Sequence, residues 1–277
     1  MSEKRKKTLF IWIGSIITCI ICLLPFFWML LISFTKYPNF LASKDVPFIL
    51  TLSNYQQILA EADLHILDYF KNSVIIALVV TVLTVVVASF AAYAVSRIQF
   101  RGKSIIIMVI LAVSMFPQIS IVGYLFKIMT SLGWINTYQA LIFPYTAWTM
   151  PMSLWILISY FTQLPKDLDE AAMIDGASRI QTLTRIIIPL AAPSIFSTAL
   201  LVFISSFNEF MFALMLTTDY HARTIPVGIA MFQGLHGEIP WGQVMATSAI
   251  AAVPLVILTL IFQRYIVQGL TAGALKD

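Results

Sequence analysis

Long apolar stretches alternate with short polar segments along the whole of this 277-residue chain. The apolar stretches carry almost no charge, and each is long enough for a bilayer-crossing helix, which needs about 20 apolar residues. Pro117, with Lys127 beyond it, indicates that the third stretch ends in a short interfacial helix. The pattern predicts an all-α membrane protein with one transmembrane domain, residues 1–277, and six transmembrane helices at residues 8–34, 72–96, 104–124, 138–162, 193–217 and 243–264.

Composition excludes a soluble globular protein. Apolar residues make up 60% of the chain, charged residues make up 11%, and the mean hydropathy is +0.90. In a typical soluble domain about a quarter of the residues are charged. The lipid bilayer is therefore the expected surrounding of most side chains. The net charge of +4 is accounted for by basic residues next to the spans and gives no reason to expect nucleic acid as a partner.

The basic residues set the expected orientation. If the N-terminus is cytoplasmic, twelve of the 17 lysine and arginine residues fall on inside segments and the remaining five fall outside. Lysine and arginine are concentrated in the cytoplasmic loops of membrane proteins. We therefore expect both termini, and the polar segment 165–192, on the cytoplasmic side.

Residues 165–192 interrupt the apolar pattern between the fourth and fifth spans. Acidic residues just after Pro165 suit the positive N-terminal end of a helix. Gly176 supplies a stop, because glycine takes left-handed backbone angles without penalty. A second short helix is expected from Ser178 to Pro189, where the chain turns toward the membrane again.

The first of these short helices offers a surface for another protein. Three- and four-residue spacing places Leu168, Ala171, Ala172 and Asp175 near one helical face. The paired alanines leave that face low enough for another protein's backbone to approach. The alternative is an ordinary helix-turn-helix linker between two spans.

Glu209 is the one acidic residue inside an expected span. An ionised acid at the bilayer centre costs roughly 3 kcal/mol on insertion scales, so such residues face the protein interior or water. Ser205, Asn208 and Phe212 share a helical face with it. Two interpretations stay open: Ser205, Asn208 and Glu209 line a translocation pathway, or Glu209 forms an interhelical hydrogen bond that locks two subunits together.

Motifs for catalysis and metal binding are absent from the sequence. Gly102-Lys103-Ser104 is similar to the end of a phosphate-binding loop, but Arg97 stands where the first glycine should be. The three histidines lack metal-ligand spacing, and no nucleophile elbow is present. We expect no catalytic residue, no metal site and no bound cofactor.

Two segments resemble a known family. Glu170-Ala171-Ala172, followed by Asp175-Gly176-Ala177 and by Pro189, resembles the EAA loop of ABC importer permeases, a cytoplasmic loop that holds a separate ATPase subunit. Residues 268–276, QGLTAGALK, are very similar to the C-terminal tail of maltose-type sugar permeases. Ile188 and Leu183 depart from the usual loop residues, and both departures bear on the strength of ATPase docking.

The resemblance implies a type I ABC importer permease fold in a bacterial or archaeal plasma membrane. Its partners would be a homologous second permease, an ATPase dimer that uses ATP and Mg, and an extracytoplasmic solute-binding protein. The substrate would be a sugar or an oligosaccharide. By resemblance, Glu170, Ala171, Ala172, Asp175, Gly176 and Pro189 couple to the ATPase through the loop 165–192, and the tail 267–277 contacts it through Gly269, Leu270, Thr271 and Gly273.

Two other functions compete with this one. An ABC permease for a non-sugar solute is the nearer alternative, and the C-terminal tail argues against it. An ion-coupled secondary transporter or channel is the other. Such transporters usually show paired repeats and more intramembrane charges, whereas this chain has one.

Overall fold

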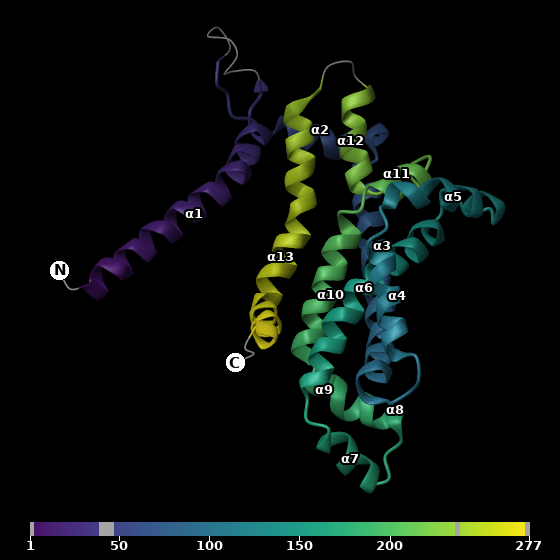
Figure 1. Cartoon of the computed structure of the whole chain (residues 1–277). Coiled ribbons are helices and arrows are strands. Elements are labelled where there is room, and N and C mark those ends of the chain that lie inside the picture. Colours follow the sequence, from purple (N-terminus) through teal and green to yellow (C-terminus); the bar gives the residue numbers. More distant parts are fainter. Residues whose placement is uncertain (1–2, 39–46, 236–238, 275–277) are drawn as a thin grey trace. The chain divides into compact units, whose positions relative to one another are not determined.

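The computed structural model of this protein describes residues 3–38, 47–235 and 239–274 (Figure 1). Within those ranges the regular secondary structure is helical apart from one isolated antiparallel bridge between Thr35 and Leu50. This confirms the expected all-α fold. The helices are α1 (Glu3–Ser33), α2 (Ser53–Ala60), η2 (Ala62–Leu64), α3 (Ile66–Arg97), α4 (Lys103–Ser114), α5 (Gln118–Ser131), α6 (Tyr138–Gln163), α7 (Asp167–Ile174), α8 (Arg179–Thr182), η3 (Leu183–Ile187), α9 (Ile188–Leu190), α10 (Ala192–Phe207), α11 (Met211–Leu216), α12 (Ile225–Leu235) and α13 (Trp241–Ala274).

Among the described residues, four helices are long and apolar enough to cross a membrane: Phe10–Ser33, Ile66–Arg97, Tyr138–Gln163 and Trp241–Gln263. Two bent pairs pass the same test together. Lys103–Ser114 and Gln118–Ser131 meet at 93°, and Arg179–Leu190 and Ala192–Phe207 meet at 81°. The described residues therefore contain four candidate spans, or up to six if each bent pair is one span.

The third expected span is not one continuous helix. α4 ends at Ser114, and α5 starts at Gln118 and runs in a different direction. Pro117 has no N–H to donate and disfavours helical angles at the residue before it. The separate helix expected at this end is therefore present, but the straight part is shorter than residues 104–124.

The fifth expected span, residues 193–217, is also interrupted. α10 ends at Phe207, and α11 begins at Met211. The break falls on Asn208 and Glu209, so the residues on its two sides do not form one helical face. The shared face expected for Ser205, Asn208, Glu209 and Phe212 is therefore not observed, because the helix stops inside it.

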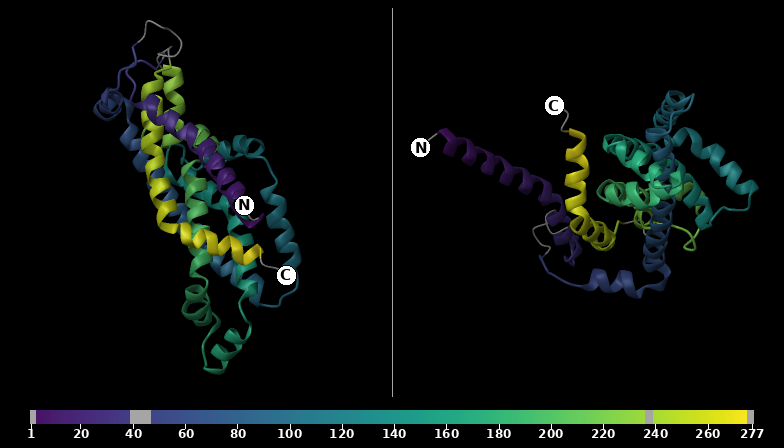
Figure 2. Two further views of the ribbon diagram at one scale, coloured as in Figure 1. Left: turned by 90° about the vertical axis from the view of Figure 1, so that its left-hand side faces the viewer. Right: turned by 90° about the horizontal axis from the view of Figure 1, so that it is seen from below.

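Leu67–Gly228 and Pro254–Asp277 form one compact unit. In this unit α7 and α8 lie beyond one end of α10, whereas α5 and α11 lie at the opposite end (Figures 1 and 2). A buried cluster joins α3, α6 and η3 near the α7 end. Its members are Ala88, Ala92, Tyr93, Leu154, Leu157, Phe161, Leu183, Ile187 and Ala191.

At the α5 end of this unit, two asparagines hold loops in place. The buried Asn72 amide donates to the carbonyls of Tyr220 (2.9 Å) and Arg223 (3.0 Å), and its oxygen accepts from the Tyr138 hydroxyl. Asn136, whose φ is 61°, accepts from the N–H groups of Thr218 and Asp219. These bonds fix the chain between α11 and α12.

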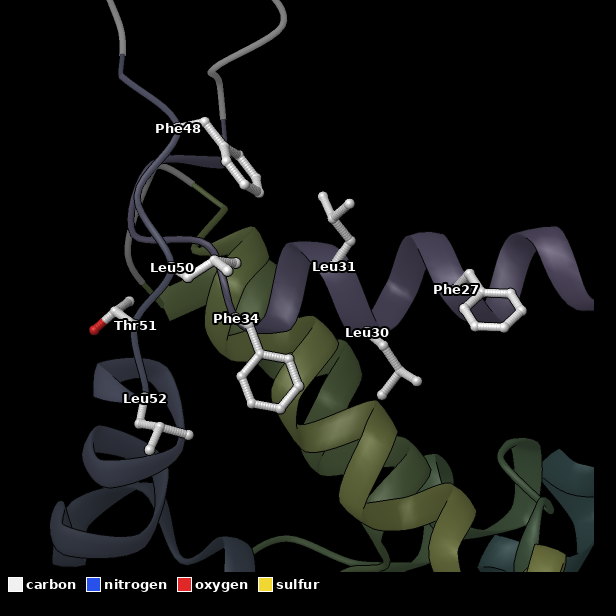
Figure 3. Close-up of a pocket in the computed structure, with 8 residues that line it drawn as sticks. All are labelled: Phe27, Leu30, Leu31, Phe34, Phe48, Leu50, Thr51 and Leu52. Carbon is white, nitrogen blue, oxygen red and sulfur yellow. The ribbon is translucent and has the colours of Figure 1, made fainter.

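Met1–Ile66 and Ile229–Val253 form the second unit. Inside it the Asn54 amide donates to the carbonyls of Ser33 (2.8 Å) and Thr35 (3.1 Å). Gly242 is needed there because a Cβ would lie 2.7 Å from the Asn54 side chain. A groove of about 800 Å³ lies beside the end of α1, lined by Phe27, Leu30, Leu31, Phe34, Phe48, Leu50, Thr51 and Leu52 (Figure 3).

Candidate functional site

The first short helix of the polar segment, α7, is closed by a glycine motif at its C-terminal end. Gly176 has φ of +80°. Its N–H donates to the Met173 carbonyl at 3.1 Å, and the Ala177 N–H donates to the Ala172 carbonyl at 2.9 Å. This pair of bonds is the Schellman arrangement, which needs a left-handed residue. The stop expected at Gly176 is observed, and its physical reason is the positive φ.

The second short helix begins with a capping box. The Ser178 N–H donates to the Gln181 side chain at 2.8 Å, and the Gln181 N–H donates to the Ser178 hydroxyl at 3.3 Å. After α8 the chain continues through the π-helical turn η3 into α9, which contains Pro189. The expected element from Ser178 to Pro189 is thus present. The Ser178–Gln181 spacing is a known helix-start signal that the sequence interpretation missed.

The exposed surface of the loop differs from the expected one. Glu170, Ala171, Asp175 and Gly176 are exposed, but Ala172 is only 4% exposed. Ala172 packs inward, so the two alanines do not form a common outward surface. That part of the sequence interpretation is corrected, because α7 turns its Ala172 side toward the rest of the protein.

Large apolar side chains, and not Ala172, form the exposed apolar part of the loop. Ile174 is 85% exposed, Ile180 is 64% exposed and Met173 is 41% exposed. All three lie on the two short helices or the residues that join them. We call these three residues, with Glu170 and Ala171, the loop surface. Exposed apolar side chains that lie together are typical of surfaces that bind another protein.

A buried ion pair connects α7 to the end of α3. The Tyr93 hydroxyl donates to Asp169 Oδ1 at 2.8 Å. Arg97 Nε lies 3.6 Å from Asp169 Oδ2, and a second guanidinium nitrogen of Arg97 donates to the Leu164 carbonyl at 2.9 Å. The Arg97 and Asp169 side chains are 2% and 8% exposed. The pair therefore holds α7 against the end of α3, because separating the two side chains would leave a buried charge without a partner.

Glu209 caps a helix. Its carboxylate accepts from the N–H of Phe212 at 2.9 Å and from the N–H of Ala213 at 3.2 Å, and the residue is 8% exposed. These N–H groups belong to the first turn of α11, where helical partners are lacking. Asn208 is exposed and donates to the Ile204 carbonyl at 2.8 Å. Sequence reasoning considered a pathway and a subunit contact for Glu209, but did not consider a cap.

Ser205 differs from Glu209 in its surroundings. It is exposed on α10 and lines a cavity of about 200 Å³ between α4, α6 and α10. The three expected pathway residues therefore differ in exposure. Ser205 faces open space, Asn208 is exposed at the helix end, and Glu209 is turned inward.

The C-terminal residues expected to contact an ATPase are Gly269, Leu270, Thr271 and Gly273. Their backbone continues α13, which runs without interruption to Ala274. The side chains of residues 264–274 and the whole of residues 275–277 lie outside the described residues. Among the side chains that are described, no group of three metal-binding residues occurs.

Comparison with known proteins places the chain in a family. Residues 84–272, which include the polar loop and both helix breaks, match the family of binding-protein-dependent transport system inner membrane components. The chain belongs to this family. The resemblance stated for Glu170-Ala171-Ala172 and for the C-terminal residues is thereby confirmed at the level of the family.

Relatives in this family include sugar permeases of archaea and bacteria. The trehalose/maltose transport system permease protein MalG of Thermococcus litoralis is 64% identical over 276 residues, which is 100% of this chain and 99% of that protein. The trehalose transport system permease protein SugB of Mycobacterium tuberculosis is 40% identical over 255 residues, or 92% of each chain.

A solved structure shares the fold. A chain of a bacterial ABC transporter involved in the import of the acidic polysaccharide alginate superposes with a TM-score of 0.77 and 20% sequence identity. The superposition covers 96% of this chain and 98% of that one. The type I importer permease fold expected from the sequence is confirmed by this likeness.

Proposed function

We propose that this chain is a permease subunit of an ATP-driven, binding-protein-dependent sugar importer. The observation that carries the proposal is the 64% identity to a trehalose/maltose permease over essentially the full length of both chains. The plasma membrane of an archaeon or bacterium is the corresponding location. A non-sugar substrate loses support, because the second relative reported above is also a sugar permease. Family membership also removes the support for an ion-coupled secondary transporter.

The energy source is proposed to be a separate ATPase that docks on the loop surface. The segment with α7 and α8, which carries this surface, lies at one end of its unit (Figure 1), and Ile174, Ile180 and the acidic Glu170 are exposed on it. The ATPase dimer would bind ATP and Mg, whereas this chain would bind neither. The C-terminal residues Gly269 to Gly273 are proposed as a second contact with that dimer.

Transmission from the loop is proposed to pass through the Asp169–Arg97 pair and the buried cluster at η3. Closure of the ATPase dimer would move α7, and α3 and α6 would follow because their ends are packed on the loop. A homologous second permease would complete the pathway, and an extracytoplasmic solute-binding protein would deliver the sugar. Both termini and the loop are assigned to the cytoplasm, as the basic residues indicate.

Reconstitution tests the proposal. The chain would be assembled in proteoliposomes with its partner permease, its ATPase and its binding protein, and uptake of radiolabelled maltose and trehalose would be measured. We expect uptake of at least one sugar that requires ATP and the binding protein. ATP hydrolysis by this chain alone, or uptake driven by an ion gradient without ATP, would contradict the proposal.

A further inference from the structure

The groove of about 800 Å³ beside the C-terminal end of α1 lies within one compact unit of the chain (Figure 3). Its volume falls within the range of about 300–1,000 Å³ that is typical of small-molecule sites. Seven of its eight lining residues are apolar, and the eighth is Thr51. The groove therefore suits a ligand with a large hydrocarbon part.

Backbone hydrogen bonds join the two walls of the groove. The Thr51 N–H donates to the Phe34 carbonyl at 2.6 Å, and the Lys36 N–H donates to the Ile49 carbonyl at 2.9 Å. Phe34 also packs on Tyr55, with ring centroids 5.0 Å apart. These contacts fix residues 48–52 against the end of α1, so the groove is built into the chain and needs no ligand to form it.

Polar groups next to the groove are bonded inside the protein. The hydroxyls of Ser33 and Tyr55 pair at 2.8 Å, and the Thr35 hydroxyl donates to the Leu31 carbonyl at 2.7 Å. The Asn54 amide donates to the carbonyls of Ser33 and Thr35. A bound peptide strand relies on main-chain hydrogen bonds to its site, whereas a hydrocarbon chain asks for none. The groove therefore favours a hydrocarbon chain over a peptide strand.

The sequence of α1 places the groove at the surface of the membrane. The apolar span of this helix ends at Ser33, and Phe27 lies about 9 Å before that end at 1.5 Å per residue. Trp28 and Tyr37 are exposed on the two sides of the same end. These two residue types gather where the hydrocarbon layer meets water. The groove thus extends from the hydrocarbon layer to the head groups, as a lipid molecule does.

One positive charge lies at the polar end of the groove. Lys36 is exposed, and its bond to Ile49 places its backbone between the two walls. Its Nζ lies 5.3 Å from the centroid of the Tyr37 ring, a contact that leaves the charge in place. Within the described residues 27–38 and 47–60, Lys36 is the one charged residue. A negatively charged head group would therefore complement this end of the groove.

We propose that this groove binds one membrane lipid with a negatively charged head group. A hydrocarbon chain of the lipid lies along Phe27, Leu30 and Phe34, and the head-group phosphate pairs with Lys36. The bound lipid covers apolar side chains of both walls and so holds residues 48–52 to α1 more firmly. The proposal requires only that the chain lies in a membrane, so it does not depend on which solute is transported.

The first test locates the lipid by photochemical labelling. The assembled importer would be placed in bilayers of equal parts phosphatidylglycerol and phosphatidylcholine, with a diazirine in the acyl chain of one lipid or the other. Labelled peptides would be mapped by mass spectrometry. We expect label on residues 27–34 and 48–52, about fivefold more from the phosphatidylglycerol probe because one lysine favours it. Equal labelling by the two probes, or no label on these residues, would overturn the proposal.

The second test repeats the labelling with variants of the head-group end and of the groove itself. Lys36→Gln should remove the preference for phosphatidylglycerol, whereas Lys127→Gln, at an exposed position on α5, should keep it. Leu30→Trp fills the groove and should cause loss of label on residues 48–52. Leu23→Trp is the matched control, because Leu23 is exposed on α1 two turns earlier and does not line the groove. Equal effects of a variant and its control would overturn the proposal.

A helix of the second permease is the competing occupant of the groove. In that case lipid label on residues 27–34 and 48–52 is absent from the assembled importer, and Leu30→Trp, but not Leu23→Trp, lowers recovery of the permease pair. This result would overturn the lipid site and leave the proposed function intact. Sugar uptake is not a readout of either test, so a failure of the proposed function is recognised separately, in the reconstitution described above.

Discussion

The Tyr93 hydroxyl donates a hydrogen bond of 2.8 Å to the Asp169 carboxylate, across a separation of 76 residues in sequence. This bond ties the loop 165–192 to the end of the long helix α3. Arg97, one turn further along α3, lies on the other oxygen of the same carboxylate. The loop is therefore attached to the membrane helices by side chains as well as by the chain itself.

Removing the Asp169 carboxylate should lower the free energy of unfolding more than removing the Tyr93 hydroxyl does. Asp169→Ala leaves the buried Arg97 without a counter-charge and should destabilise the assembled permease by about 3 kcal/mol or more. Tyr93→Phe removes one hydrogen bond and should cost about 1 kcal/mol. Thermal unfolding of the purified complex measures both. Asp167→Asn, on the exposed side of the same helix, is the control, and an equal effect at Asp167 would contradict the assigned ion pair.

Gly176 should tolerate asparagine far better than valine. No neighbouring atom lies within 4 Å of a Cβ at this position, so any cost comes from the backbone angle of +80°. Left-handed angles cost a β-branched residue roughly 1–2 kcal/mol, whereas asparagine adopts them more readily. We expect Gly176→Val to lower the sugar transported per ATP hydrolysed, with normal membrane insertion. Gly176→Asn should keep a transport-to-hydrolysis ratio close to that of the wild type. An equal loss of this ratio in both variants would mean that the added side chain, and not the backbone angle, causes the defect.

Ile174, the more exposed of the two isoleucines on the loop surface, should matter for ATPase binding. Ile174→Ser removes an apolar side chain that is 85% exposed and should weaken ATPase binding by about tenfold if that side chain is buried on docking. Pull-down of the ATPase with the permease pair, at several concentrations, measures the change. Leu132→Ser, at an exposed position next to α5, should have no effect. Unchanged binding of the Ile174 variant would remove this residue from the loop surface.

Replacing Glu209 should lower the stability of the assembled complex and leave transport nearly unchanged. Glu209→Gln keeps one accepting oxygen of two and should cost about 1 kcal/mol through the lost bond to α11. At matched amounts of assembled complex, uptake should remain near that of the wild type. A cysteine at 209 should resist water-soluble maleimide, because the residue is 8% exposed. Rapid labelling of the cysteine at position 209 would contradict this expectation and would support a place for Glu209 on the translocation pathway.

Asp219 should make the loop after α11 sensitive to acid. The His221 N–H, the Asn136 amide and the His221 ring hydrogen-bond the carboxylate and lower the pKa of Asp219 from 3.8 to about 2. A depressed pKa stabilises the folded state above the unfolded pKa, and this contribution disappears as the pH falls through the folded pKa. The stability difference between wild type and Asp219→Asn should therefore shrink from pH about 4 to pH about 2. A difference that stays constant over this range would contradict the assignment.

Hydropathy predicted the positions of the four long apolar helices closely, because bilayer crossing is a property of about 20 consecutive residues. It could not locate the breaks, since Met115, Phe116 and Phe210 are as apolar as the helices around them. Pro117 was a visible signal for the first break. Asn208-Glu209 became a second one only when Glu209 was seen to cap α11.

The loop was recognised from its own residues, but its attachment was not. Gly176 and Ser178 act on neighbours in the sequence, so their roles follow from local helix rules. For Asp169 the sequence indicated only a local role, as an acidic residue at a helix N-terminus. Its buried partners Tyr93 and Arg97 come from a distant helix, and no periodicity connects them. Ala172 shows the same limit, because the inward side of a short helix depends on what packs against it.

Because the segment from Leu183 to Ile187 forms a π-helical turn, the direction in which the loop surface faces depends on the number of residues in this segment. A π turn holds one residue more than an α turn, and each residue of a helix turns the direction of its side chains by about 100°. Deletion of one residue between Thr182 and Ile188 would rebuild an ordinary helix and rotate Ile180 and Ile174 away from any partner that they now face. Most single substitutions in this turn would leave that direction unchanged. Changes of length here are thus a stricter barrier to exchanging such loops between permeases than changes of sequence.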